Sequence, residues 1–435
     1  FLEEYDPQIR RDRGVYYTPD AVVDYMVRTV DHLLRTRFNL RLGLADPTTW
    51  GKFGASIPAG ANAGQHVVQI LDPATGTGTF LLHSLQVIFE TMRAEYKRLE
   101  YDDETAARAW VTYVRSDLLP RINGFELMMA PYIVAHLRLG LALASGLAEE
   151  NGLDVGRWGF RFAPDDRLRV FLTNTLEPNT RPQIMALGEH VADEARQAEL
   201  LKKERPVLVV LGNPPYDRVA SGVDASIQGF LVDKVPGRES NNSLFADILD
   251  VAREHTIFSH HASLYNLYVY FWRWAMWKAL ENPLAPGIVS FITASSWLTG
   301  PGFVGLRKLA RDQGDEMWTV DLGGDNKGAN PEPNVFNIQT PVAITTVLRG
   351  RVAAEEQAVA HYRKVNGSSG AEKLAAVKAL HSTGDPLAGD WTPATGNSMD
   401  PLVPAGGGAA WLDMPALTDL FPWQQPGCKY GRLWP

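Results

Sequence analysis

The stretch Val207-Leu-Val-Val-Leu211-Gly-Asn-Pro-Pro-Tyr216 holds the strongest structural and chemical signals in the chain. Residues 207 to 211 are apolar and rich in valine, which predicts a short buried strand of a parallel sheet. Neither a strand nor a helix can continue through the two prolines that follow, so the backbone leaves the sheet there. Because ligands of open α/β sheets bind at the carboxyl ends of the strands, we expect this turn to lie in a binding crevice.

The turn carries the groups needed to hold a planar amino group. The side-chain oxygen of Asn213 and the carbonyl of Pro214 can accept both hydrogens of an exocyclic amine. Pro215 adds no backbone donor, and the ring of Tyr216 can stack on a flat base. The same residues are also typical of an ordinary turn, so the interpretation depends on what stands elsewhere in the chain.

Length and composition limit the classes of protein to consider. The 435 residues suit one large α/β domain and part or all of a second. The 42 Lys and Arg against 50 Asp and Glu give a net charge of −8, which argues against this segment alone making every phosphate contact of a DNA complex. The single cysteine, Cys428, excludes an intramolecular disulfide framework and a Cys-based zinc site, and we predict no metal site.

The sequence also suggests the cellular compartment of the protein and the extent of the polypeptide. One cysteine fits a reducing cytoplasm, where we expect the protein. We find no signal peptide and no apolar run near 18 residues, so we expect no membrane segment. The chain begins at Phe1 without a methionine, and we expect it to be part of a longer polypeptide.

A well-marked helix start follows the charged residues 1 to 13. In Gly14-Val-Tyr-Tyr-Thr-Pro19, we predict Thr18 as the N-cap and Pro19 as the first helical residue. Apolar residues at helical spacing then predict a helix to about Arg37. The free N–H groups at such a helix start favour a carboxylate, although a capped helix without a ligand explains the pattern equally well.

A glycine turn follows the first predicted strand, Val67 to Leu71. The sequence Asp72-Pro-Ala-Thr-Gly76-Thr-Gly78-Thr-Phe80 leads into a predicted helix that ends near Arg98. Strand, glycine turn and helix in this order let a backbone approach a nucleotide-like ligand closely. The Lys-Ser/Thr pair of phosphate-binding loops is missing, which disfavours a nucleoside triphosphate.

Two further polar residues follow predicted strands. Glu126 ends the strand from Ile122, where a carboxylate can take both hydroxyls of a ribose or simply face solvent. Asn174 follows the strand from Leu168 to Leu172 and reaches a ligand or only forms its turn. Downstream we predict a core helix over 264–280, strands over 287–292 and 318–322, a hairpin-like edge from Asn334-Val-Phe336 and 341–348, and a helix over 371–381.

The order of these motifs resembles that of the amino-group DNA methyltransferases that use S-adenosylmethionine. Tyr-Tyr-Thr-Pro, the glycine turn, Gly-Phe-Glu and Asn-Pro-Pro-Tyr match the gamma order, in which cofactor motifs precede the catalytic motif. Arg13-Gly-Val-Tyr-Tyr-Thr-Pro preceded by Tyr5-Asp-Pro, together with Asn174-Thr-Leu-Glu177, looks like the methyltransferase part of type ISP single-polypeptide restriction-modification enzymes.

The resemblance implies a fold and a division into domains. The expected fold is α/β, a Rossmann-like methyltransferase sheet with helices on both faces, plus the start of a target-recognition region. Residues 1–13 would be a linker, 14–349 the methyltransferase domain with an insertion near 217–262, and 350–435 a connector and the start of target recognition. Family members fuse a nuclease and a helicase-like ATPase before this region and target recognition after it.

The resemblance also implies roles for individual residues. The catalytic turn would be Asn213, Pro214, Pro215 and Tyr216, acting on the N6 amino group of an adenine that is flipped out of double-stranded DNA. Tyr216 and Phe336 would stack on that base. The cofactor would contact Tyr16, Thr18, Pro19, Asp72, Ala74, Gly76, Gly78, Phe80, Glu126 and Asn174, and Asn174 stands where the family often has an Asp.

Other functions remain open at this point. Asn-Pro-Pro-Tyr also serves methyltransferases that act on protein glutamines or RNA adenines. A methyltransferase-like fold can act as a DNA-binding scaffold without catalysis, or as the methylase of another phage-defence system. Tyr after Asn-Pro-Pro favours adenine over cytosine as the target.

Overall fold

The computed structural model describes residues 17–54, 56–177, 189–216, 244–254, 263–282, 285–326, 331–336, 338–350, 357–382, 384–394, 396–397 and 399–404. Tyr16, the linker over 1–13, most of the insertion over 217–262 and Cys428 lie outside these residues.

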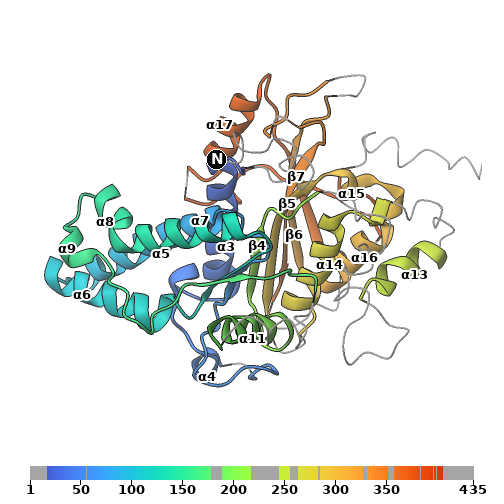
Figure 1. Ribbon diagram of the computed structural model, residues 1–435. Coiled ribbons are helices and arrows are strands. Elements are labelled where there is room, and N and C mark those ends of the chain that lie inside the picture. Colours follow the sequence, from blue (N-terminus) through green and yellow to red (C-terminus); the bar gives the residue numbers. More distant parts are fainter. Residues whose placement is uncertain are drawn as a thin grey trace, which may run out of the picture.

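A nine-stranded sheet forms the centre of the described structure (Figure 1). Its strand order is β3-β2-β1-β4-β5-β7-β6-β8-β9. The strands are β1 (Ile70–Asp72), β2 (Ile122–Glu126), β3 (Arg169–Leu172), β4 (Val209–Gly212), β5 (Gly287–Ala294), β6 (Glu316–Gly323), β7 (Val342–Arg349), β8 (Val359–Lys364) and β9 (Thr392–Pro393).

Strands β1 to β5 all run parallel. The direction in which the chain adds strands to the sheet reverses at β1. The chain adds β2 and β3 on one side of β1 and then returns to place β4 on the other side. Such a reversal leaves a crevice outside the carboxyl ends of the two central strands, here β1 and β4. The predicted glycine turn and the predicted Asn-Pro-Pro-Tyr turn follow these two strands, so the topology brings them to one place.

Helices cover both faces of the sheet, each over its own apolar cluster (Figure 1). One face carries α3 (Asp20–Arg37), α5 (Thr79–Arg98), α7 (Met129–Leu141) and α17 (Gly370–Leu380). The other carries α11 (Glu189–Lys203), α14 (Leu267–Ala279) and α16 (Val304–Gln313), with α13 (Ala246–Glu254) packed on α16. The fold therefore confirms the expected α/β class with helices on both faces.

Short elements complete the described chain. They are η1 (Gly43–Ala45), α4 (Trp50–Phe53), α6 (Asp103–Tyr113), the π-turns η2 (Val114–Leu118) and η3 (Ala142–Gly146), α8 (Leu147–Glu150), α9 (Val155–Trp158), α15 (Ser296–Thr299) and η6 (Pro301–Phe303).

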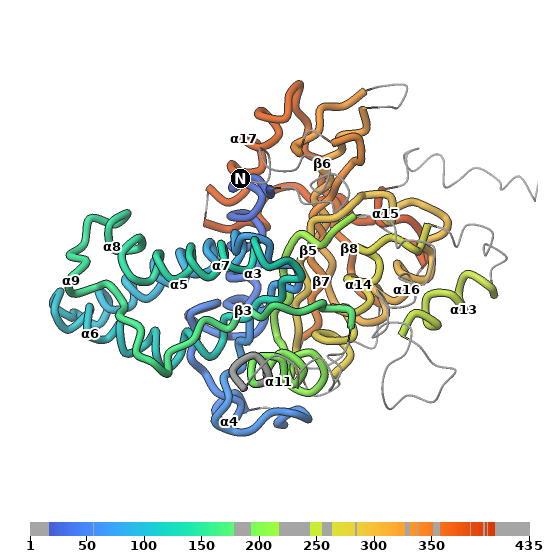
Figure 2. The backbone as a smooth tube through the Cα atoms, viewed as in Figure 1, coloured from blue at the N-terminus to red at the C-terminus, as the bar shows by residue number. Residues whose placement is uncertain are grey.

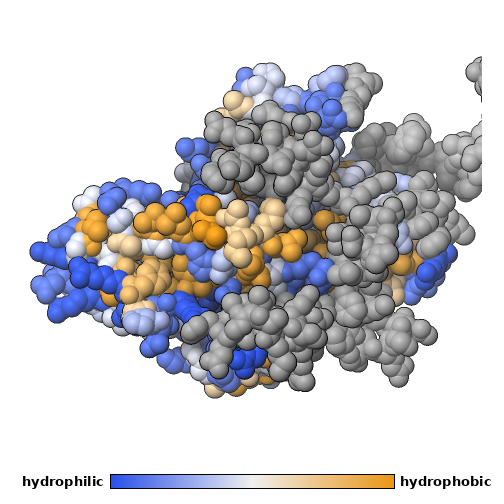
Figure 3. All heavy atoms as spheres, in the orientation of Figure 1, coloured by the Kyte–Doolittle hydropathy of each residue, from blue (hydrophilic) through white to orange (hydrophobic). Residues whose placement is uncertain are grey.

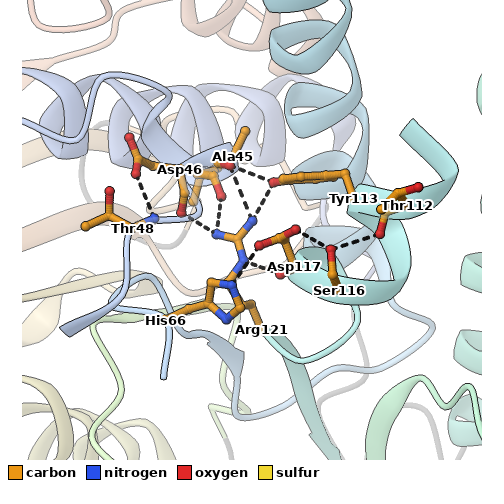
Figure 4. A network of polar contacts seen from close by, with 10 residues as sticks. Ala45, Asp46, Thr48, His66, Thr112, Tyr113, Ser116, Asp117 and Arg121 are labelled. Carbon is orange, nitrogen blue, oxygen red and sulfur yellow. Dashed lines mark hydrogen bonds and ion pairs between the residues drawn. The ribbon is translucent and has the colours of Figure 1, made fainter. Parts of the chain in front are cut away.

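A buried arginine fastens the opposite, amino-terminal edge of the sheet (Figure 4). Arg121 directly precedes β2 and is fully buried. Its Nη1 donates to the carbonyls of Leu44 and Asp46 at 3.1 and 2.9 Å, and its Nη2 donates to the Tyr113 hydroxyl. Nearby, His66 and Asp117 lie 2.9 Å apart. This network holds the η1 segment against the sheet, away from the crevice.

The carboxyl half of the sheet differs from the expected hairpin-like edge. Strand β7 lies inside the sheet, antiparallel to both β5 and β6, so it is not an edge strand. Beyond residue 349, β8 pairs with β6, and α17 packs on α3 (Figure 2). The division of domains near residue 349 stays a prediction, but the sheet itself continues to β9.

One described helix is, by its length and composition alone, long and apolar enough to cross a membrane. The run Met129–Glu150 spans 22 residues, so the expectation of no apolar run near 18 residues was wrong. In the fold, α7 packs against α5, β2 and β3, which accounts for its buried apolar side. Its outer side exposes Met129, Ile133, Leu137 and Leu141 at four-residue spacing, on a face where apolar atoms gather (Figure 3).

Candidate functional site

Two turns meet at the crevice between β1 and β4. Gly212, the last residue of β4, packs so closely on Asp72 that an added Cβ would lie 2.7 Å from the Asp72 Oδ1. Asp72 ends β1, and Asn213 directly follows Gly212. The start of the glycine turn and the start of the Asn-Pro-Pro-Tyr turn are therefore packed against each other.

The carboxylate of Asp72 is enclosed at this junction. The residue has no exposed surface; its Oδ1 accepts a hydrogen bond from the Ala74 N–H at 3.0 Å, and among the described residues its Oδ2 has no hydrogen-bond partner. Burial raises the pKa of Asp72 to about 8, and the Glu126 carboxylate adds to the shift while the Ala74 N–H opposes it. Asp72 is therefore an enclosed carboxyl group between the two turns.

The glycine turn presents open backbone beside an acid. Gly76 has a φ of +55°, and a Cβ there would meet no atom of the described residues within 4 Å, so this part of the chain leaves its backbone open to a ligand. Its N–H donates to the Glu126 Oε2 at 2.8 Å, and the Met128 N–H donates to the Oε1 at 2.8 Å. Burial raises the pKa of Glu126, and hydrogen bonds from the N–H groups of Met128, Gly76 and Leu127 oppose that shift, so the carboxylate keeps an acceptor position for a ligand hydroxyl.

Gly78 and Phe80 lie deeper in this turn than Gly76. Gly78 has a φ of +83° and packs against Ala135 of α7, so its role is a close backbone approach between helices. Phe80 is buried in the apolar cluster on the face of the sheet that α3 and α5 cover. Ala74 is partly buried against the apolar cluster on the other face of the sheet, which α11, α14 and α16 cover.

Asn213 joins the turn to the start of α3. Its Nδ2 donates to the Thr18 Oγ1 at 3.0 Å, and its Oδ1 accepts from the Tyr216 hydroxyl at 2.7 Å. Thr18 was predicted as the N-cap of α3, and this prediction was wrong. Pro19 occupies the N-cap position without a side-chain cap, and the Thr18 hydroxyl is turned toward Asn213.

The remaining residues of the turn are placed as follows. Pro214 is buried, and Pro215 and Tyr216 are half-buried. The Ile292 carbonyl lies 3.2 Å from the Tyr216 hydroxyl oxygen and shares its single hydrogen with Asn213, and the Tyr216 ring meets the Tyr268 ring edge to face at 6.4 Å. Phe336 is half-buried and packs, like Tyr216, against the cluster over α3 and α5.

Asn174 lies on the turn that follows β3. Its Oδ1 accepts from the Leu176 N–H at 3.0 Å, which is the hydrogen bond of a turn-forming Asn. The neighbouring Thr175 hydroxyl donates to the Pro73 carbonyl, so the turn is tied to the glycine turn. Both readings of Asn174 from the sequence therefore stay open, since its carbonyl oxygen keeps one lone pair.

Two basic residues near the crevice were not predicted from the sequence. Arg138 of α7 donates to the carbonyl and hydroxyl oxygens of Thr77, both at 3.0 Å. Lys202 of α11 donates to the Thr173 Oγ1 and the Glu177 carbonyl at the other end of the site. In sequence, both look like solvated residues of amphipathic helices, so only the structure reveals their contacts.

The fold and the two adjoining turns define the class: an open α/β sheet in which the order of strand addition reverses between β1 and β4. No protein-family model matches the sequence, and no curated protein matches it either. Solved structures do match. The DNA-bound ATP-dependent type ISP restriction-modification enzyme LlaBIII superposes with a TM-score of 0.61 at 20% identity, over 89% of this chain and 22% of its own.

Two other complexes with DNA show the same fold. A nuclease-deletion mutant of the type ISP enzyme LlaGI, bound to a DNA substrate mimic, gives a TM-score of 0.60 at 20% identity over 89% of this chain and 27% of its own. The DrdV–DNA complex gives 0.55 at 23% identity over 87% and 30%. The chain thus has a fold found within type ISP restriction-modification enzymes, as the motifs predicted, and spans about a quarter of their length.

Proposed function

We propose that the chain is the methyltransferase region of a restriction-modification enzyme and that it methylates the N6 amino group of an adenine in a specific DNA sequence. The observation that carries the proposal is the contact between Gly212 and Asp72. It joins an amino-group acceptor pair to a nucleotide-type glycine turn in one crevice. The DNA-bound neighbours of the same fold support DNA as the substrate.

The crevice fits S-adenosylmethionine, which supplies an electrophilic methyl group when bound. The open backbone at Gly76 allows a ligand to approach, and the Glu126 carboxylate beside it can accept a hydrogen bond from a ribose hydroxyl. Asn174 and its turn would contact the adenine end. Tyr16, Thr18 and Pro19 would hold the methionine end, and Tyr16 lies outside the described residues.

Asn213 and Pro214 would prepare the amino group of the target base. The nitrogen lone pair of adenine is delocalised into the ring, so the amino group is a poor nucleophile. Hydrogen bonds from its two hydrogens to the Asn213 Oδ1 and the Pro214 carbonyl would draw the lone pair out of conjugation. Positioning and electrostatics then provide the rate enhancement, without a strongly basic side chain.

The base must leave the duplex to reach this crevice. Extrusion costs a few kcal/mol, and stacking on an aromatic ring returns about 1–3 kcal/mol per base. Tyr216 and Phe336 both pack on the cluster over α3 and α5 and are the proposed stacking rings. The remaining domains of the polypeptide, with nuclease, helicase-like ATPase and target recognition, are proposed from the type ISP resemblance.

Methyl transfer with nucleoside analysis tests this function. The full polypeptide that contains this chain is incubated with labelled S-adenosylmethionine and unmethylated bacterial DNA. We expect labelled N6-methyladenine, which is lost with Asn213→Ala and kept with the exposed control Asn151→Ala. Labelled N4-methylcytosine would overturn the choice of base, label on protein or RNA would overturn the substrate, and cofactor binding without transfer would indicate a scaffold.

A further inference from the structure

Lys202 lies fully buried at the carboxyl end of β3. It belongs to the last turn of α11, and its ammonium donates to the Thr173 Oγ1 at 2.5 Å and to the Glu177 carbonyl at 3.0 Å. The ammonium also lies 5.7 Å from the centre of the Phe125 ring. Both oxygen acceptors belong to the turn from Thr173 to Glu177, so one side chain bridges the two ends of that turn.

The same turn is fixed at two other points to the proposed cofactor site. The Thr173 N–H donates to the carbonyl of Glu126 at 2.7 Å, and the Thr175 hydroxyl donates to the carbonyl of Pro73. Asn174 lies between these anchors. Lys202 therefore supplies the third attachment, from the helix layer behind the sheet.

The burial of the charged Lys202 ammonium is unusual and costs free energy. Fully buried lysines are rare, and an ammonium moved out of water is costly unless its hydrogen bonds are made. An apolar side chain of similar length would fill the same space without that cost. Burial lowers the pKa of Lys202 to about 8, which Glu199 and Glu177 oppose, so the group is still mostly charged at neutral pH.

We propose that Lys202 is a positioning residue that holds the Asn174 turn in the conformation that binds the adenine end of the cofactor. Lys202 acts through Thr173 and Glu177 and does not touch the ligand itself. The inference rests on the proposed function, because it assigns the Asn174 turn to the cofactor. It predicts that removing the ammonium weakens cofactor binding and leaves the methyl-transfer step unchanged.

Calorimetric binding of S-adenosylhomocysteine to the full polypeptide tests this role. We expect Lys202→Met to raise Kd about tenfold and to raise the KM for S-adenosylmethionine by a similar factor, with kcat within about twofold. Lys203→Met, on the same helix turn but paired with Glu199 and partly exposed, should bind like wild type. Equal Kd values for wild type and Lys202→Met would overturn the inference.

A double-mutant cycle separates positioning from general loss of packing. If Lys202 acts through the turn that carries Asn174, the effects of Lys202→Met and Asn174→Ala on Kd should be clearly non-additive. Additive effects would overturn the inference.

A milder variant covers the case in which Lys202→Met does not fold. Thr173→Val keeps the lysine and removes one acceptor, and it should raise Kd about threefold; an unchanged Kd would again overturn the inference. If wild type binds no S-adenosylhomocysteine, the proposed function fails and the inference fails with it. If wild type binds it and the variants bind equally, only the inference fails.

Discussion

The Tyr216 hydroxyl donates a hydrogen bond to the Asn213 Oδ1 at 2.7 Å. That oxygen is the one expected to accept a hydrogen of the target amino group. The structure therefore places the proposed stacking residue and the proposed acceptor in mutual contact, and the Asn213 Oδ1 keeps one lone pair for the amino group of a bound base.

Replacing Tyr216 separates the role of its ring from that of its hydroxyl. Tyr216→Phe keeps the aromatic face and frees the Asn213 oxygen, so we expect kcat within about threefold of wild type. Tyr216→Ala loses stacking worth roughly 1–3 kcal/mol and should lower kcat/KM about tenfold or more, but less than Asn213→Ala does. Single-turnover methylation measures both variants, and equal losses for Phe and Ala would show that the hydroxyl, not the ring, is required.

Gly212 should not tolerate a larger residue. A Cβ there would lie 2.7 Å from the Asp72 Oδ1, and that buried carboxylate cannot move into water. We expect Gly212→Ala to lower the free energy of unfolding by roughly 1–3 kcal/mol, as overpacking does elsewhere.

Denaturant unfolding checks the Gly212 prediction against a matched control. A Cβ on Gly140 of α7 would meet nothing within 4 Å, and Gly140→Ala should be neutral or stabilising by up to about 1 kcal/mol because alanine favours helix. Similar losses for the two variants would show that the contact with Asp72 is not the cause.

Asp72 should make stability depend on pH. Burial raises its pKa in the folded state from 3.8 to about 8, so the folded protein keeps a proton that the unfolded chain releases. The resulting stabilisation is complete below about pH 4 and is lost as the pH rises to about 8. Asp72→Asn cannot ionise, so its Tm relative to wild type should increase over that range; a difference that stays constant or falls with pH would contradict the assignment.

Helices and strands whose ends are marked by glycine, proline or a change of periodicity could be predicted from the sequence. The predicted strand over Ile122–Glu126 is confirmed in full, and the helix after the glycine turn ends at Arg98 as expected. The strand before Asn213 runs over Val209–Gly212, two residues later at its start than predicted and one later at its end. In each case glycine, proline or a change of periodicity marks the boundary within a few residues.

Long-range contacts account for what the sequence did not predict. The Thr18 hydroxyl accepts a hydrogen bond from Asn213, which is 195 residues away in the sequence, and does not cap its own helix. Strand β7 follows β6 in the chain but lies between it and β5, which adjacency alone does not indicate. Strand β8 carries His361, Arg363 and Lys364 and so lacks the apolar pattern of a buried strand. These features depend on partners that only the folded chain brings together.

The pairing of β8 with β6 limits how this region can be dissected for experiments. A fragment cut after residue 349, where the sequence favours a boundary, would keep β7 beside β6 but would expose the other edge of β6, from Glu316 to Asp321, which pairs with β8. Its backbone N–H and C=O groups would then be free to pair with other chains, and such exposed strands promote aggregation. A fragment for expression should therefore extend at least through β9, which ends at Pro393.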